Sequence, residues 1–181
     1  MGLKNRIFPG HTYFLTMTVV DWVDVFTRPA YRHIIIDALR YCQQHKSLEL
    51  YAWCLMSNHL HLIAATPPEK NLSDILRDFK RFTSKAITTA IERDPESRRQ
   101  WPLHRFAYNA RINPKSEIYK FWQDGNEAKE LITLDFTLQQ LHYLHQNPVR
   151  AELVAEPEHY LYSSASNYAE QGGLLDVLLL G

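Results

Sequence analysis

The chain has 181 residues, 45% of them hydrophobic, and its formal net charge is zero. This size and apolar content predict one domain over residues 1–181 with a sizeable core. We expect residues from about 155 to 181 to form a C-terminal extension of that domain. Cys42 and Cys54 have no further cysteines with which to form a disulfide framework or a Cys-type zinc site. The sequence has no run of eighteen uncharged apolar residues and no secretory signal, so we expect a cytoplasmic protein without a membrane partner.

The first half of the chain alternates between strand and helix patterns. Residues 12–20 alternate apolar and polar side chains, with Thr16 and Thr18 on one face, and predict a strand. Residues 30–46 and 71–91 repeat apolar side chains at helical spacing and predict two amphipathic helices. Between these helices, residues 47–56 and 59–65 predict a hairpin that turns at Ser57-Asn58.

This order of elements indicates an α+β fold, in which a ferredoxin-like antiparallel sheet carries helices on one face and leaves the other face free. Residues 93–125 are irregular in pattern, with short strands expected around 105–112 or 119–123. Residues 134–147 predict a third helix that ends before Pro148. The apolar residues 174–180 suggest an edge strand or a partner-binding segment.

Two pairs of polar side chains stand out from these patterns. His59 and His61 lie two apart on a predicted strand, so both project from one face, where they either share a cation or are ordinary solvent-facing polar residues. Tyr143 and Asn147 lie four apart on a predicted helix, away from its leucine stripe. They either serve one small site, or the tyrosine packs at the surface while the asparagine caps the helix.

Charge is unevenly distributed along the chain. Residues 75–120 carry a net charge of +6, and residues 121–181 carry −7. The basic segment is either an anion-binding face or a solvated helix followed by a loop.

Four stretches together resemble the REP-associated tyrosine transposases, a branch of the single-tyrosine HUH nucleases: "MSNHLHLI", "DFKRFTSKAI", "FWQ" and "YLHQNPVRAELV". The resemblance implies an HUH-type fold, a divalent metal (Mg²⁺ or Mn²⁺) bound by His59, His61 and Asn147, and Tyr143 as the nucleophile. It also implies nicking and rejoining of single-stranded hairpin DNA through a 5′-phosphotyrosine, by a monomer or a homodimer. Ser57 and Glu152 depart from the family pattern, which has Pro and Gly at these places.

The expected DNA contacts are basic residues in or beside these motifs. They are Lys80, Arg81, Lys85 and Arg150. The sequence is also compatible with two alternatives to the nickase. One is a catalytically silent protein that binds hairpin DNA, and the other is an unrelated metallohydrolase that uses the two histidines with water as its nucleophile.

Overall fold

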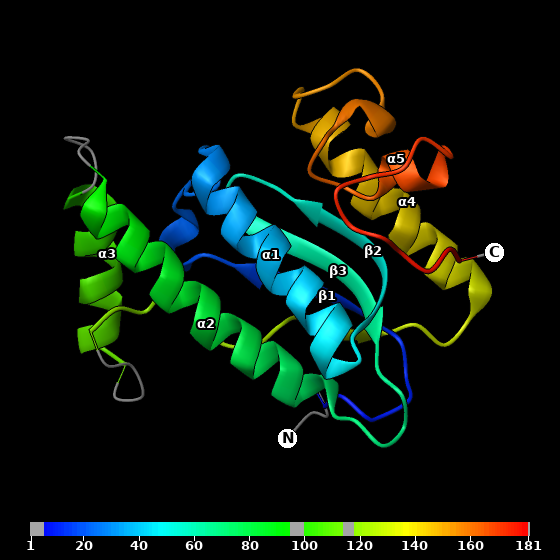
Figure 1. Cartoon of the computed structure of the whole chain (residues 1–181), viewed down its shortest axis with the longest axis horizontal. Helices are drawn as coiled ribbons and strands as arrows, with labels where there is room; N and C mark the ends of the chain where they lie inside the picture. The colour runs from blue at the N-terminus through cyan, green and yellow to red at the C-terminus, as the bar shows by residue number, and fades with distance from the viewer. Residues whose placement is uncertain (1–5, 95–99, 114–117, 181) are drawn as a thin grey trace.

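The computed structural model describes residues 6–94, 100–113 and 118–180. Its centre is an antiparallel sheet in the order β2-β3-β1-β4 (Figure 1). The strands are β1 (Tyr13–Thr18), β2 (Glu49–Leu55), β3 (His59–Ala65) and β4 (Lys129–Glu130). This sheet with its helices confirms the predicted α+β class.

Helices α1 (Pro29–Lys46) and α2 (Leu72–Arg93) cover one face of the sheet (Figure 1). Leu60 and Leu62 point to this face and are fully buried, as the alternation along β3 requires. Both helices begin at clear sequence signals. Pro29 occupies the first turn of α1, and the Asn71 side chain caps α2 by accepting a hydrogen bond from the Ser73 backbone N–H.

Helix α3 (Gln100–Arg111) lies beside α2 (Figure 1). The strand expected around 105–112 is therefore wrong. Phe106 and Ala110, which lie four residues apart, are the buried positions of this helix, a spacing that suits one face of a helix. From 119 to 123, the structure forms a single bridge between Trp122 and Val19, just before the short helix η1 (Val20–Trp22).

Helix α4 (Leu134–Arg150) packs on the opposite face, which the sequence had led us to expect free. Its buried residues Leu141 and Leu144 explain this position, because they need an apolar surface to cover them. The helix continues past Pro148, where a stop was expected. Pro148 lies in the last turn, and burial of its ring offsets part of the cost of the hydrogen bond that it cannot donate.

The C-terminal segment runs along the outer edge of β2. It contains the short helices η3 (Pro157–His159) and α5 (Ala165–Tyr168). Three backbone hydrogen bonds join it to the strand: Leu55 N–H to Tyr162 O (2.8 Å), Ser164 N–H to Trp53 O (2.9 Å) and Leu178 N–H to Leu50 O (2.9 Å). Across the sheet, the segment 121–126 pairs with the end of β1 in a similar way. Within the described ranges, no helix is long and apolar enough to cross a bilayer.

Candidate active site

The two histidines of β3 project together from the face that α4 covers. Their ring centroids are 4.7 Å apart, and the strand register places Thr18 opposite His59 and Thr16 opposite His61. His61 is buried, with 4% of its surface exposed, and His59 is partly buried. The sheet therefore fixes two imidazoles side by side at one end of β3.

Both imidazoles are neutral at physiological pH. Burial, and to a smaller extent the neighbouring His59 and Lys129, lower the pKa of His61 to about 3. Burial also lowers the pKa of His59, although Asp24 opposes this shift. A neutral imidazole has a free lone pair, which is the form that binds a metal.

Tyr143 of α4 lies against His61. Its ring centroid is 5.7 Å from that of His61 and 6.0 Å from that of Phe14. The side chain is 38% exposed, so a ligand can approach it from solvent. The guanidinium of Arg150 lies 5.2 Å from the centroid of the Tyr143 ring, which places a permanent positive charge beside the phenol.

Asn147 occupies the next turn of the same helix. Its Nδ2 donates a hydrogen bond to the backbone oxygen of Tyr143 (2.8 Å), which leaves its Oδ1 as an available acceptor. Because α4 continues to Arg150, Asn147 is not the helix cap. His59, His61, Tyr143 and Arg150 thus meet on one face of the sheet, with Asn147 on the adjoining helix turn.

The donor set fits a divalent cation. Two neutral imidazole nitrogens and one amide oxygen leave positions for water and for a phosphate oxygen. In the part of the chain that the structure describes, no three His, Cys, Asp or Glu side chains form a metal-binding group. Asn147 is the amide side chain one helix turn from Tyr143, and its Oδ1 is a type of oxygen that binds divalent cations.

Several residues that contact the site were not predicted from the sequence. Thr16 Oγ1 lies 3.0 Å from His61 Nδ1, and Asn58 Oδ1 lies 2.7 Å from His59 Nδ1. Lys129 of β4 places its ammonium 5.6 Å from the centroid of the Phe14 ring, at the edge of the site. The alternation of residues 12–20 gave a signal for Thr16, but a two-residue strand such as β4 has no recognisable pattern.

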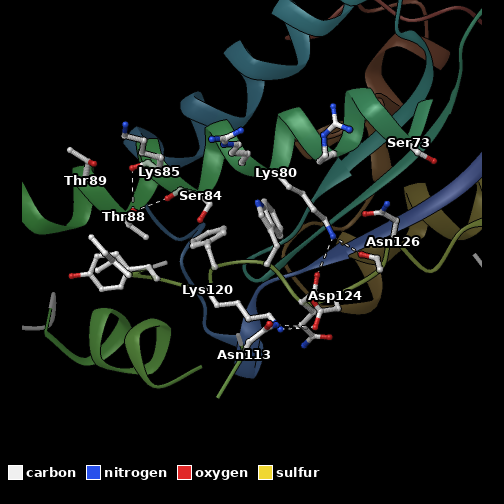
Figure 2. Close-up of a pocket in the computed structure, with 18 of the residues that line it drawn as sticks. Ser73, Lys80, Ser84, Lys85, Thr88, Thr89, Asn113, Lys120, Asp124 and Asn126 are labelled. Carbon is white, nitrogen blue, oxygen red and sulfur yellow. Dashed lines mark hydrogen bonds and ion pairs between the residues drawn. The ribbon is translucent and has the colours of Figure 1, made fainter. Parts of the chain in front are cut away.

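The other three predicted DNA contacts lie elsewhere, on α2. This helix and residues 113 and 118–126 line an open groove with a volume of about 870 Å³ (Figure 2). Arg81 and Lys85 are exposed along it, and neither forms an ion pair with another described residue. Because α2 covers the face opposite α4, the groove and the histidine site are separate surfaces.

Lys80 differs from its two neighbours because it is already bound within the protein. Its ammonium donates to the backbone oxygens of Gln123 (3.1 Å) and Gly125, and Figure 2 shows the side chain reaching from α2 to this segment. Burial lowers its pKa to about 8. Lys80 therefore holds the wall of the groove in place.

The family model described as "Transposase IS200 like" matches residues 10–125, which is more than half of the chain. The chain belongs to this transposase family. The IS200-like assignment confirms the resemblance seen in the sequence, and it covers β1 to β3 with both histidines. No curated protein matches the chain significantly.

Among solved structures, a REP-associated tyrosine transposase bound to a REP hairpin is similar over 100% of this chain and 92% of its own, with a TM-score of 0.64 and 17% identity. This IS200-like chain therefore shares its fold. A putative transposase from Deinococcus radiodurans R1 is also 17% identical, with 81% of this chain and 97% of that chain covered and a TM-score of 0.43.

Proposed function

We propose that this transposase nicks and rejoins single-stranded hairpin DNA, with Tyr143 as its nucleophile and His59, His61 and Asn147 as ligands of a divalent metal, Mg²⁺ or Mn²⁺. The observation that carries the proposal is the contact of the Tyr143 ring with His61, since these residues lie 82 positions apart in the sequence. The phenol thereby lies beside a neutral imidazole and a guanidinium, which supports a catalytic role for Tyr143.

The reaction that we propose is the one that the resemblance to the REP-associated tyrosine transposases implies. The Tyr143 oxygen attacks the phosphorus of the scissile phosphodiester, and the bond from phosphorus to the 3′ oxygen breaks. The phenolic proton passes to water, and the departing 3′ oxygen takes up a proton to become a hydroxyl. The 5′ phosphate stays joined to Tyr143. Attack by another 3′-hydroxyl reverses these steps and joins DNA without an external energy source.

The residues around Tyr143 would bind the metal and supply positive charge for this reaction. The neutral His59 and His61 and the free Oδ1 of Asn147 would hold the cation, which supplies Lewis acidity toward the scissile phosphate. Arg150, beside the Tyr143 ring, and Lys129, beside the Phe14 ring, would add positive charge close to the scissile phosphate. The nucleophile itself is partly exposed, so a DNA strand can approach it without opening the core.

The DNA partner is proposed from charge and from the similar structure. Arg150 stands at the catalytic face, while Arg81 and Lys85 line the α2 groove, where they can contact backbone phosphates, and Lys80 holds the wall of that groove. The solved transposase of the same fold is bound to a REP hairpin. A palindromic hairpin with single-stranded flanks is accordingly the substrate that we propose here.

The decisive experiment incubates the purified protein with labelled hairpin DNAs and Mn²⁺ or EDTA, followed by denaturing gels. We expect a metal-dependent covalent adduct that disappears in Tyr143→Phe and persists in Tyr41→Phe, a matched change at an exposed tyrosine of α1. Hairpin binding without any adduct would favour a silent DNA-binding protein. Cleavage that survives in Tyr143→Phe would favour a metallohydrolase with water as its nucleophile.

A further inference from the structure

The turn between β2 and β3 is attached to a second loop that is remote in sequence. Residues 19–26 bind both residues of this turn: Val19 N–H donates to Asn58 O (2.9 Å), and Phe26 N–H donates to Ser57 O (2.8 Å). The side chains add to this, because Ser57 Oγ donates to Asp24 Oδ1 (2.6 Å). The turn that precedes His59 is thus held in one position.

These contacts also fix the orientation of the Asn58 amide. Its Nδ2 donates to Asp24 Oδ1 (2.9 Å) and to the backbone oxygen of Trp22 (3.3 Å). Both partners are acceptors, so the nitrogen of the amide must face them and Oδ1 must face His59. The 2.7 Å contact of Oδ1 with His59 Nδ1 then requires the proton on Nδ1, which leaves the lone pair on Nε2.

The second loop is itself held in an unfavourable backbone conformation. Asp21 and Trp22 have φ angles of 54° and 55°, in the left-handed region that side chains other than glycine rarely adopt. Helix α3 stabilises this conformation, because Arg105 Nη2 and Asn109 Nδ2 lie 2.6 Å and 2.8 Å from Asp21 Oδ2. Strain of this kind persists only where surrounding contacts require it.

We propose that Asn58, oriented by Asp24, is a positioning residue that fixes His59 in the Nδ1–H tautomer and so presents Nε2 to the metal. The inference rests on the proposed function for the role of the metal. The orientation itself is a property of the protein without metal. Partners of this type, which bind the second nitrogen of a ligating histidine, commonly change metal affinity by about 10- to 100-fold when they are removed.

The first test measures the tautomer of His59 in the metal-free protein, by long-range ¹H–¹⁵N NMR correlations at pH 7.5. We expect the Nδ1–H form in the wild type and a shift toward Nε2–H in Asn58→Ala. An Nε2–H form in the wild type, or no change in the variant, would overturn the inference. This readout does not depend on catalysis or on metal binding.

The second test measures Mn²⁺ affinity of the full chain by calorimetry. Asn58→Ala and Asp24→Ala should each weaken binding by about 10- to 100-fold, whereas Asp24→Asn, which keeps an acceptor oxygen, should restore most of it. Asn71→Ala, at the cap of α2, is the matched control, because it lowers stability without touching the site. Equal affinities in Asp24→Ala and Asp24→Asn would overturn the role of Asp24.

The two tests separate this inference from the proposed function. A wild-type protein that binds no Mn²⁺ would refute the proposed metal site, and the tautomer of His59 would still decide whether Asn58 positions the ring. Tight binding of Mn²⁺ that is unchanged in Asn58→Ala would refute the positioning role while the metal site stands.

Discussion

Replacing Glu152 with glycine should stabilise the protein. Glu152 follows the C-terminal cap of α4 with a φ of 56°, where its N–H bonds to Val149 O (2.9 Å) and the next N–H, of Leu153, bonds to Pro148 O (3.0 Å). This is the position after a helix where glycine is commonest, because a Cβ there meets the following carbonyl oxygen. Glu152 is exposed, so its removal costs little packing.

The size of the gain comes from two opposing terms. A side chain in the left-handed conformation costs about 1–2 kcal/mol, and glycine relieves this cost. Glycine also gives the unfolded chain more freedom, which costs about 0.4–1 kcal/mol. The net expectation is a rise of about 1 kcal/mol in the free energy of unfolding, equivalent to about 2–4 °C in Tm for a chain of this length.

Urea and thermal unfolding of matched variants measure this gain. Glu152→Ala removes the same charge but keeps the Cβ, so its stability should lie within about 0.5 kcal/mol of the wild type. Glu156→Gly changes an exposed glutamate whose φ is −122°, where no strain is relieved, and should destabilise. If Glu152→Gly is no more stable than Glu152→Ala, the argument from backbone strain is refuted.

Three further predictions concern pH, salt and metal. Burial lowers the pKa of His145 from 6.5 to about 4, so the unfolded chain binds a proton that the folded chain excludes as the pH falls from about 6.5 to about 4. Stability should decline over that window, and His145→Gln should decline less steeply in urea titrations; equal slopes would contradict this. The affinity for a labelled hairpin can be measured in anisotropy titrations at several salt concentrations. Arg81→Gln and Lys85→Gln should each reduce the slope of the logarithm of the DNA-binding constant against the logarithm of the salt concentration by about 1. Arg40→Gln on α1 should leave this slope unchanged. If all three behave alike, the groove does not contact phosphates. Mn²⁺ should bind more tightly than Mg²⁺ in calorimetry because imidazole favours transition metals, and the reverse order would argue against histidine ligands.

The sequence predicted the parts of the fold that depend on local pattern. The alternating apolar and polar residues of 12–20 and the apolar repeats of α1 and α2 gave the right elements, because each pattern leaves a periodic signal in the sequence. Helix α3 was missed since its buried contribution is small, with Phe106 and Ala110 as its buried residues. The two residues of β4 are too few to give a period.

Local sequence patterns also predicted part of the candidate site, but not the contacts between remote residues. Strand geometry predicted that His59 and His61 share a face, and helix geometry predicted that Tyr143 and Asn147 lie one turn apart. That α4 would place Tyr143 against His61 followed from the resemblance and not from any spacing. The link from Asp24 to the histidine turn joins positions 34 apart through an irregular loop, and no local pattern records such a contact.

The C-terminal segment along β2 has a consequence for self-association. A bare edge strand offers unpaired N–H and C=O groups to a second chain, and proteins cover such edges to avoid unwanted pairing. Here the hydrogen bonds to Leu50, Trp53 and Leu55 occupy that edge, and β4 at the opposite end is only two residues long. Two copies of this chain cannot merge their sheets through β2 unless residues 162–178 move away from that edge.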